Sequence, residues 1–302
     1  MNPSRITLGT AQLGMKYGIA NRSGRPSFDE AKKILHFAVE NGVNSLDTAP
    51  VYGESEDVIG EFLESENLES QILITTKLPS LTSRKVELSS VPQVVSVELE
   101  RSLRRLKVDS VWNYLVHDYR DVENYGEVLV ESLSEHRASG RVKHIGVSVY
   151  TPEEAEVVLT FPSFDTIQFP FNLFDHRFAR SGVLEKLKKK GFTTFARSAF
   201  LQGLFFLNPE ELPLALSKVH EHLINLRKMA VETGLSVEEL ALGYLKEQKS
   251  IDSVVIGVDT LEQLERNLTI FNRVSLSDQV IKKVEDLFSD IEEDIIDPRR
   301  WR

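Results

Sequence analysis

Eight short apolar segments alternate with longer amphipathic segments along the whole chain, and this alternation sharply limits the folds available to it. Short apolar runs rich in β-branched residues predict buried strands, and apolar residues spaced three and four apart predict helices. Strands separated by crossover helices are parallel, because each helix returns the chain to the same end of the sheet. Eight such units in 302 residues, without a linker, predict one domain over residues 1–302, an α/β (β/α)8 TIM barrel. An open doubly wound sheet is the alternative.

The predicted strands and helices follow one another in strict order. The strands are Arg5–Gly9, Val43–Leu46, Ile72–Thr76, Val111–Val116, Ile145–Ser148, Thr166–Phe169, Phe192–Ala196 and Ser253–Gly257. The helices are Phe28–Glu40, Glu56–Leu63, Pro92–Leu106, Asn124–Ala138, a helix beginning at Pro152, Gly182–Lys190, Lys218–Thr233, Val237–Gln248, Leu261–Phe271 and Asp278–Ser289. Ser27 and Thr151 are the expected N-caps of two of them, and Pro152 suits a first helical position.

Composition narrows the classes of function. The net charge of −10 argues against a general nucleic-acid binder, which needs a positive surface to neutralise phosphates. The absence of cysteine excludes disulfide scaffolds, thiolate metal sites and cysteine nucleophiles. The first residues lack the apolar core of a signal peptide, and no apolar run approaches the length of a membrane span. We therefore expect a cytoplasmic protein without a membrane or nucleic-acid partner, whose oligomeric state the sequence leaves open.

Ionisable residues stand at the ends of three consecutive predicted strands. Asp47, Lys77 and His117 end the second, third and fourth strands, and Tyr52 lies in the loop after Asp47. Each residue alone also fits a structural role: a turn cap, a rim lysine, a buried histidine, a packing aromatic. Because active sites of barrels lie at the carboxyl ends of the strands, the four side chains together predict a shared site.

These residue types suit proton transfer to an oxygen. A free phenol has a pKa near ~10, too high for easy exchange at neutral pH, and a neighbouring ammonium is expected to lower it. In this interpretation Asp47 holds Lys77, and His117 hydrogen-bonds the substrate oxygen. The four groups supply no electrons, so the chemistry implies a cofactor that donates hydride.

The order and spacing of several short motifs resemble the aldo-keto reductase superfamily over nearly the whole chain. The motifs are Leu8–Gly14 (LGTAQLG), Asp47–Gly53 (DTAPVYG), Thr76-Lys77, Val116-His117, Gly146–Ser148, Gln168–Leu173 (QFPFNL), Ala199–Leu204 (AFLQGL), and Ile256-Gly257 followed by Gln263 and Asn267. This resemblance implies a (β/α)8 barrel that reduces small aldehydes and ketones with NADPH or, less often, NADH.

The resemblance also implies roles for individual residues. Tyr52 would be the general acid, Lys77 and Asp47 the pair that tunes it, and His117 the group that orients the carbonyl. Ser148 and Gln168 would bind the nicotinamide carboxamide. The remaining cofactor-binding residues implied are Gly9, Thr10, Arg197, Gly203, Leu204, Gly257, Gln263 and Asn267. No histidine spacing typical of a metal site occurs, and we expect no metal.

Three positions depart from the pattern of the family. Val149 stands where an asparagine usually contacts the carboxamide, and Arg197 stands where an aromatic residue often stacks on the nicotinamide. An arginine there could favour an anionic substrate or the pyrophosphate. Basic residues that would bind a 2′-phosphate are missing near Asp259, and Arg266 is the nearest candidate. NADPH is the first expectation from the resemblance, and NADH is possible.

Two other functions stay open. The chain could be a catalytically slow cofactor-binding regulatory or redox-sensing subunit, as some barrels of this family are. It could also be an aldolase or isomerase that uses Lys77 as a Schiff-base amine. The identity of the substrate is beyond the sequence, although Arg197, Arg299 and Arg300 suggest an anionic or sugar-like compound. Trp301 could either cover the substrate or pack on the barrel.

Overall fold

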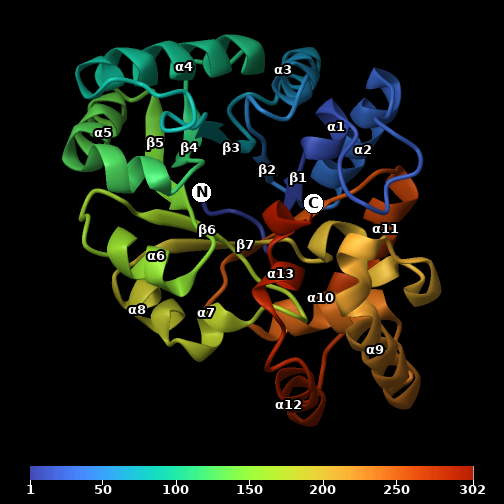
Figure 1. Ribbon diagram of the computed structural model, residues 1–302. Helices are drawn as coiled ribbons and strands as arrows, with labels where there is room; N and C mark the ends of the chain where they lie inside the picture. Colours follow the sequence, from blue (N-terminus) through green and yellow to red (C-terminus); the bar gives the residue numbers. More distant parts are fainter. Residues whose placement is uncertain (302) are drawn as a thin grey trace.

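A closed barrel of parallel strands forms the centre of the molecule. The computed structural model describes residues 1–301, and its strands pair in the order β1 to β8, with β8 returning to β1 (Figure 1). The predicted TIM barrel is confirmed, and the open sheet is excluded because every described strand is paired on both sides. The strands are β1 (Ile6–Gly9), β2 (Ser45–Asp47), β3 (Leu73–Leu78), β4 (Val111–Val116), β5 (Val142–Ser148), β6 (Thr166–Pro170), β7 (Thr193–Arg197) and β8 (Ser253–Gly257).

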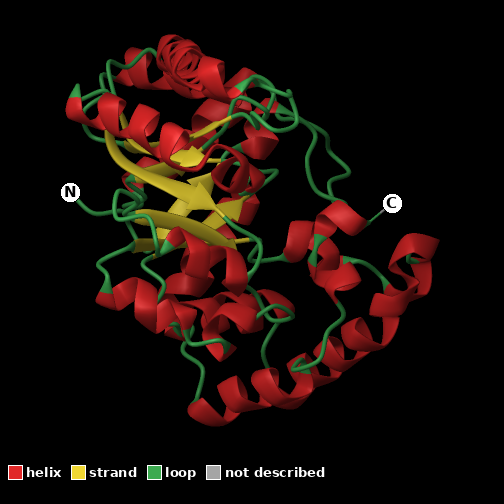
Figure 2. Cartoon of the chain, turned by 60° about the vertical axis from the view of Figure 1, so that its left-hand side comes forward, coloured by secondary structure: helices red, strands yellow, loops and turns green. Residues whose placement is uncertain are grey.

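Helices surround the barrel on its outer side (Figure 2). Those that the sequence predicts are α2 (Phe28–Glu40), α3 (Ser55–Glu66), α4 (Val91–Leu106), α5 (Arg120–Ala138), α6 (Pro152–Val158), α8 (Val183–Lys189), α9 (His220–Thr233), α10 (Val237–Glu247), α11 (Leu261–Arg273) and α12 (Asp278–Leu287). Three further helices, α1 (Ala11–Gly14), α7 (Arg177–Arg180) and α13 (Glu293–Ile296), are too short for a recognisable periodicity. No helix within residues 1–301 has the length and apolar character needed to cross a membrane.

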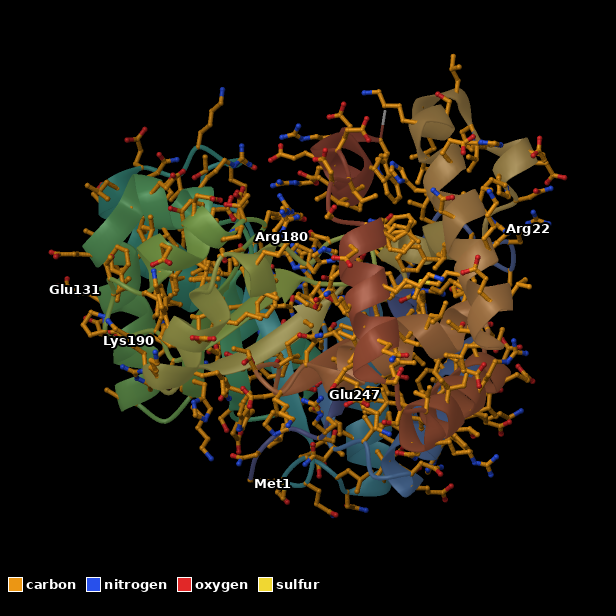
Figure 3. The ribbon with its side chains drawn as sticks, turned by 90° about the horizontal axis from the view of Figure 1, so that it is seen from below. Met1, Arg22, Glu131, Arg180, Lys190 and Glu247 are labelled. Atoms are coloured by element: carbon orange, nitrogen blue, oxygen red, sulfur yellow. The ribbon has the colours of Figure 1, made fainter. Side chains whose placement is uncertain are left out.

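Local sequence explains where several helices begin. Ser27 and Thr151 form capping boxes at the starts of α2 and α6, as expected, and Ser236 forms a third at the start of α10. Helix α5 begins at Arg120, four residues before the predicted start, and its backbone is interrupted at Gly126 (φ 45°, ψ −123°). Charged residues such as Glu131 and Lys190 project outward from the helices (Figure 3).

The interior of the barrel is closed below its carboxyl-end mouth. Leu73, Trp112 and Phe195 come from β3, β4 and β7 and pack in a small apolar cluster separate from the main core. Strands β3 and β7 lie on different sides of the barrel, so their side chains can meet only inside it. Thr7 adds a polar layer, because its hydroxyl lies 2.6 Å from that of Ser45 on β2 and 2.7 Å from that of Ser253 on β8. This filling leaves the carboxyl end as the open mouth of the barrel.

Candidate active site

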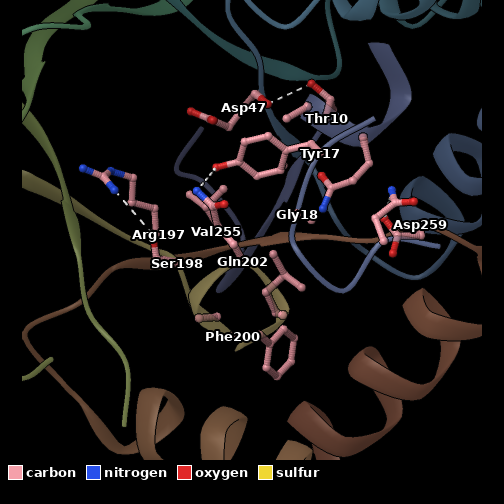
Figure 4. A pocket seen from close by; sticks show the side chains of 18 of the residues that line it. Thr10, Tyr17, Gly18, Asp47, Arg197, Ser198, Phe200, Gln202, Val255 and Asp259 are labelled. Atoms are coloured by element: carbon pink, nitrogen blue, oxygen red, sulfur yellow. Dashed lines mark hydrogen bonds between the residues drawn. The ribbon is translucent and has the colours of Figure 1, made fainter. Parts of the chain in front are cut away.

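A large cavity opens at the carboxyl ends of the strands. It encloses about 550 Å³, a size typical of a site for a cofactor or small molecule. Its walls come from the strand ends of β1, β2 and β5 to β8, from His117 after β4, from the loops after β1 and β7, and from α10 and α11 (Figure 4). Tyr52 and Asp47 line it too, so three of the four predicted catalytic side chains face one space.

Asp47 is the hydrogen-bonding centre of the site. Its carboxylate accepts two hydrogen bonds from the Lys77 ammonium, at 2.8 and 2.9 Å, and one from the Gln168 amide at 2.8 Å. Its backbone carbonyl accepts from the Thr10 hydroxyl at 2.8 Å. Side chains from β3 and β6 therefore fix the carboxylate that ends β2, and the predicted Asp47–Lys77 pair is present.

Lys77 is fully enclosed. Its ammonium donates its third hydrogen bond to the Thr48 carbonyl at 2.9 Å, and the side chain has 0% exposure. Burial lowers the pKa of Lys77, whereas Asp47 opposes that shift. An amine whose three protons are all bonded, and which does not line the cavity, is poorly placed to attack a carbonyl carbon. The geometry therefore gives the Schiff-base alternative no support.

Tyr52 and His117 lie side by side at the cavity. Their ring centroids are 5.9 Å apart at an interplanar angle of 89°, and the Lys77 ammonium lies 5.0 Å from the centre of the Tyr52 ring. Burial, and next the Asp47 carboxylate, raise the pKa of Tyr52, while Arg197 opposes them. The sequence suggested a lowered phenol pKa, and this prediction is wrong, because burial and Asp47 raise it. The Asp47 carboxylate offsets part of the effect of the Lys77 ammonium, and the effect of burial dominates.

Close backbone packing holds the loop that carries Tyr52. The Glu54 amide donates to the Gly14 carbonyl at 3.2 Å. A Cβ atom at Gly14 would lie 1.9 Å from the Tyr52 carbonyl oxygen, and one at Gly53 (φ +62°) would lie 2.4 Å from the Gly14 carbonyl oxygen. Only glycine fits at either position. These two glycines, both in motifs noted in the sequence, fix the height of Tyr52 above the barrel.

His117 is expected to stay neutral throughout the physiological pH range. Burial, and next the charges of Lys77 and Arg197, lower the pKa of His117 to about 3. We predict that its imidazole resonances in an NMR titration do not move between pH 8 and pH 5, with His117→Gln used to assign them. In the unfolded chain the group titrates near ~6.5, so this histidine makes folding less favourable as the pH falls from there toward 3. A midpoint near 6.5 in the folded protein would contradict the neutral assignment.

The structure brings most of the predicted cofactor-binding residues to the cavity. Its lining includes Gly9, Thr10, Ser148, Gln168, Arg197, Gly203, Gly257, Gln263 and Asn267. Leu204 is not among the lining residues, because its side chain is fully buried in the hydrophobic core. Lys77 is also not among the residues that line the cavity. Gly257 leaves room for a neighbour, since a Cβ there would lie 2.5 Å from the Gln12 side chain.

Two loops meet across the cavity, and sequence reasoning did not single out their contacts. The Ile19 amide donates to the Gln202 carbonyl at 3.0 Å, and the Gln202 side-chain amide donates to the Tyr17 hydroxyl at 3.2 Å (Figure 4). Burial raises the pKa of Tyr17 to about 12. A Cβ at Gly203 (φ +88°) would lie 2.6 Å from Ala20, so glycine is needed where the loops touch. Tyr17 stands three residues after the motif Leu8–Gly14, and this closeness is the only feature of the sequence that indicates a place at the cavity.

The end of the cavity between β8 and α11 carries two carboxylates and one guanidinium. Asp259 accepts a hydrogen bond from the Asn21 amide at 2.8 Å, and burial raises its pKa. Arg266 lies 3.5 Å from Glu238 in an ion pair, and all three charged side chains line the cavity. This end is therefore negative by one charge when its groups are ionised.

The other end of the cavity meets the C-terminal segment. The Arg197 guanidinium lies 4.1 Å from the centre of the Tyr150 ring, and that of Arg299 lies 3.4 Å from it. Trp301 donates from its indole nitrogen to the Ile295 carbonyl at 3.1 Å and packs against the core, but it does not line the cavity. Of the two roles left open for Trp301, the structure supports packing. Within residues 1–301 no group of acidic or histidine side chains is arranged to hold a metal ion.

Comparison with known proteins gives one consistent family. The model of the Aldo/keto reductase family matches residues 5–288. The oxidoreductase YqkF of Bacillus subtilis is 28% identical over 92% of this chain and 94% of its own length. An NADH-specific methylglyoxal reductase of Escherichia coli is 24% identical over 78% of this chain and 81% of its own. The holo structure of an aldo-keto reductase from Bacillus halodurans superposes with a TM-score of 0.78 at 20% identity, covering 98% of this chain and 96% of that one.

Proposed function

This chain belongs to the aldo/keto reductase family, and on that premise we propose that it reduces an aldehyde or a ketone to an alcohol with Tyr52 as the general acid. Members of the family are NAD(P)H-dependent oxidoreductases acting on small carbonyl compounds. The observation that carries the proposal is the placement of Tyr52 and His117 side by side at the cavity, above a buried Lys77–Asp47 pair.

The cavity residues fit a nicotinamide dinucleotide. The Ser148 hydroxyl and the Gln168 carbonyl oxygen are available to a carboxamide, because Gln168 uses its amide nitrogen for Asp47. Gly257 lines the cavity, with the Gln12 side chain where a Cβ would stand, and α11 begins four residues later at Leu261. The N-terminus of a helix suits a phosphate group. When bound, the reduced dinucleotide supplies a hydride to the carbonyl carbon.

The protein's own groups handle the oxygen and its proton. Tyr52 is protonated at neutral pH, because burial and Asp47 raise its pKa, so its hydroxyl holds the proton that the oxygen takes up as it gains charge. Neutral His117 can hydrogen-bond the same oxygen without adding charge to the site. Lys77 and Asp47 hold each other and keep a fixed ammonium near the phenol ring, where it stabilises the negative charge left on Tyr52.

A direct assay tests the proposal. NADPH and NADH are each mixed with a panel of aldehydes and ketones, and oxidation of the cofactor is followed by its absorbance. Turnover with at least one carbonyl is expected. Tight binding of both cofactors, with no oxidation by any member of the panel, would instead favour the regulatory or redox-sensing subunit.

The choice of cofactor depends on the β8–α11 end. The resemblance makes NADPH the first candidate, and NADH is the second. The residues at the β8–α11 end support NADH, because Asp259 and Glu238 repel a 2′-phosphate and Arg266 is already paired with Glu238. A carboxylate in this region suits the free 2′-hydroxyl of NADH.

Replacing Asp259 with Asn should therefore change the relative affinities. We expect the variant to bind NADPH about 10-fold more tightly relative to NADH than the parent does, a difference of about 1.4 kcal/mol. Titration of both cofactors, followed by calorimetry, measures the ratio without turnover. An unchanged ratio would mean that Asp259 lies away from the 2′-position.

A further inference from the structure

We propose that Arg197 binds an oxyanion of the substrate, so that the enzyme prefers carbonyl compounds that carry a carboxylate or phosphate group. This inference rests on the proposed carbonyl reduction and adds a substrate class to it. The proposal is based on the Arg197 guanidinium, which lines the end of the cavity that contains Tyr52 and His117. Its hydrogen bonds include no carboxylate of the described part of the chain.

The bonding of Arg197 differs from that of the neighbouring arginines. Within residues 1–301 its hydrogen bonds run to the Val149 carbonyl at 3.1 Å and the Ser198 hydroxyl at 3.4 Å, and neither acceptor is charged. The other cavity arginine, Arg266, pairs with Glu238, and Arg299 pairs with Asp297 at 2.6 Å. A partly buried cation is usually paired, so the unpaired charge of Arg197 points to an anion brought by a ligand.

The position of Arg197 assigns that anion to the reacting molecule. Arg197 ends β7 and bonds to the Val149 carbonyl, directly after Ser148 at the end of β5, so the guanidinium lies among the strand ends that carry the site. Its charge also acts to lower the pKa of Tyr52 and of His117. Asp259 lies after β8 and bonds to Asn21 instead. An anion at Arg197 is therefore near the reaction centre and away from the β8–α11 end.

The guanidinium is also held in place before any ligand arrives. It lies on the Tyr150 ring, which Arg299 contacts too, and Arg299 is fixed by hydrogen bonds to Asp297. One nitrogen of the Arg197 guanidinium donates to the Val149 carbonyl. Val149 and Arg197 are both positions that depart from the family pattern. A planar guanidinium that is already fixed in position loses little conformational entropy when it binds a carboxylate or phosphate. Arg299 is in this sense a positioning residue.

The charge distribution along the cavity agrees with this assignment. Among the side chains that line the end with Tyr52 and His117, Asp47 is bonded to Lys77, and Arg197 carries a positive charge without an ion-pair partner in the described residues. The nearby Glu154, whose carboxylate Arg299 and Arg197 stabilise, does not line the cavity. At the opposite end one negative charge is in excess. In a chain of net charge −10, a local positive site of this kind is what draws an anionic substrate to the correct end.

Matched substrate pairs test the inference. Succinic semialdehyde is compared with butanal, and glyceraldehyde 3-phosphate with glyceraldehyde, using the parent, Arg197→Met and Arg197→Lys. We expect the parent to show a kcat/KM at least 10-fold higher for one charged member than for its neutral partner. Arg197→Met should lower kcat/KM for the charged member about 100-fold more than for its neutral partner, mainly through KM. Arg197→Lys should recover part of the loss.

Controls separate the inference from the activity itself. Arg104→Met removes an exposed positive charge far from the cavity and should leave both substrate pairs unchanged. Calorimetric titration with succinate and with inorganic phosphate tests anion binding even if no carbonyl is turned over, and Arg197→Met should abolish it. Equal kcat/KM for charged and neutral partners in the parent, or an equal loss on both in Arg197→Met, would overturn the proposal. Weak anion binding that Arg197→Met leaves intact would overturn it as well.

Discussion

The Tyr52→Phe variant is expected to lose between ~10² and 10⁴ in kcat, the usual contribution of a general acid, while it binds the cofactor as the parent does. The change removes only the hydroxyl, so the ring can keep its edge-on contact with His117 and its place beside Lys77. The measurement is single-turnover oxidation of bound cofactor by an aldehyde that the parent reduces. Binding of the cofactor is titrated in parallel.

A tyrosine outside the cavity provides the control for this variant. The Tyr125 hydroxyl donates to the Val86 carbonyl at 2.8 Å, and neither residue lines the cavity. Tyr125→Phe should keep the rate of the parent. If Tyr52→Phe turned over within 3-fold of the parent, Tyr52 would not be the proton donor. If its cofactor affinity fell with the rate, Tyr52 would act in binding.

Lys77→Met is expected to abolish measurable turnover and also to lower the free energy of unfolding by about 3–5 kcal/mol. The variant leaves the Asp47 carboxylate buried, at 4% exposure, with Gln168 as its remaining side-chain donor. A buried charge without its counter-charge is costly, and it raises the carboxyl pKa until the group takes up a proton. Urea denaturation at pH 7 measures the loss.

A double variant distinguishes the structural role of Lys77 from its chemical role. Asp47→Asn combined with Lys77→Met removes both charges at once and should recover most of the lost stability, because no isolated charge stays buried. Turnover should not return, since the phenol still lacks its ammonium neighbour. Recovery of activity in the double variant would contradict the role given to Lys77. A double variant as unstable as Lys77→Met would show that the packing of the lysine stem, rather than its charge, is what matters.

Local sequence patterns were enough to predict the barrel and the group of catalytic residues at its strand ends. Strand β4 and strand β8 have the predicted bounds, because each apolar run stands between clear breaks. The positions of Asp47 and His117 at strand ends followed from the general rule that barrel loops share one mouth. The third strand was predicted to end at Lys77, one residue too early, since β3 continues to Leu78, but the pairing of Lys77 with Asp47 was predicted correctly.

What the sequence did not reveal depends on distant or irregular contacts. Gln168 bonds to Asp47 across 121 residues, and no local pattern reports such a pair. Tyr17 and Glu238 reach the cavity from a loop and from the first turn of a helix on the outer ring, where the loop path decides which side chains arrive. The direction of the Tyr52 pKa was missed because it depends on burial and on a bidentate pair, which only three-dimensional packing establishes.

The bond from Gln168 to Asp47 and the pairing of β8 with β1 have a consequence for how the molecule is made. A ribosome releases Asp47 long before Gln168 and Gly257, by roughly 10 to 40 s for the whole interval at ordinary rates of synthesis. Until β8 is made, the emerging sheet has two unpaired edges, at β1 and at its newest strand, and until Gln168 is made the Asp47 carboxylate lacks one of its donors. Unpaired edges invite association with other chains, so the barrel is protected from it only when its last strand closes the sheet.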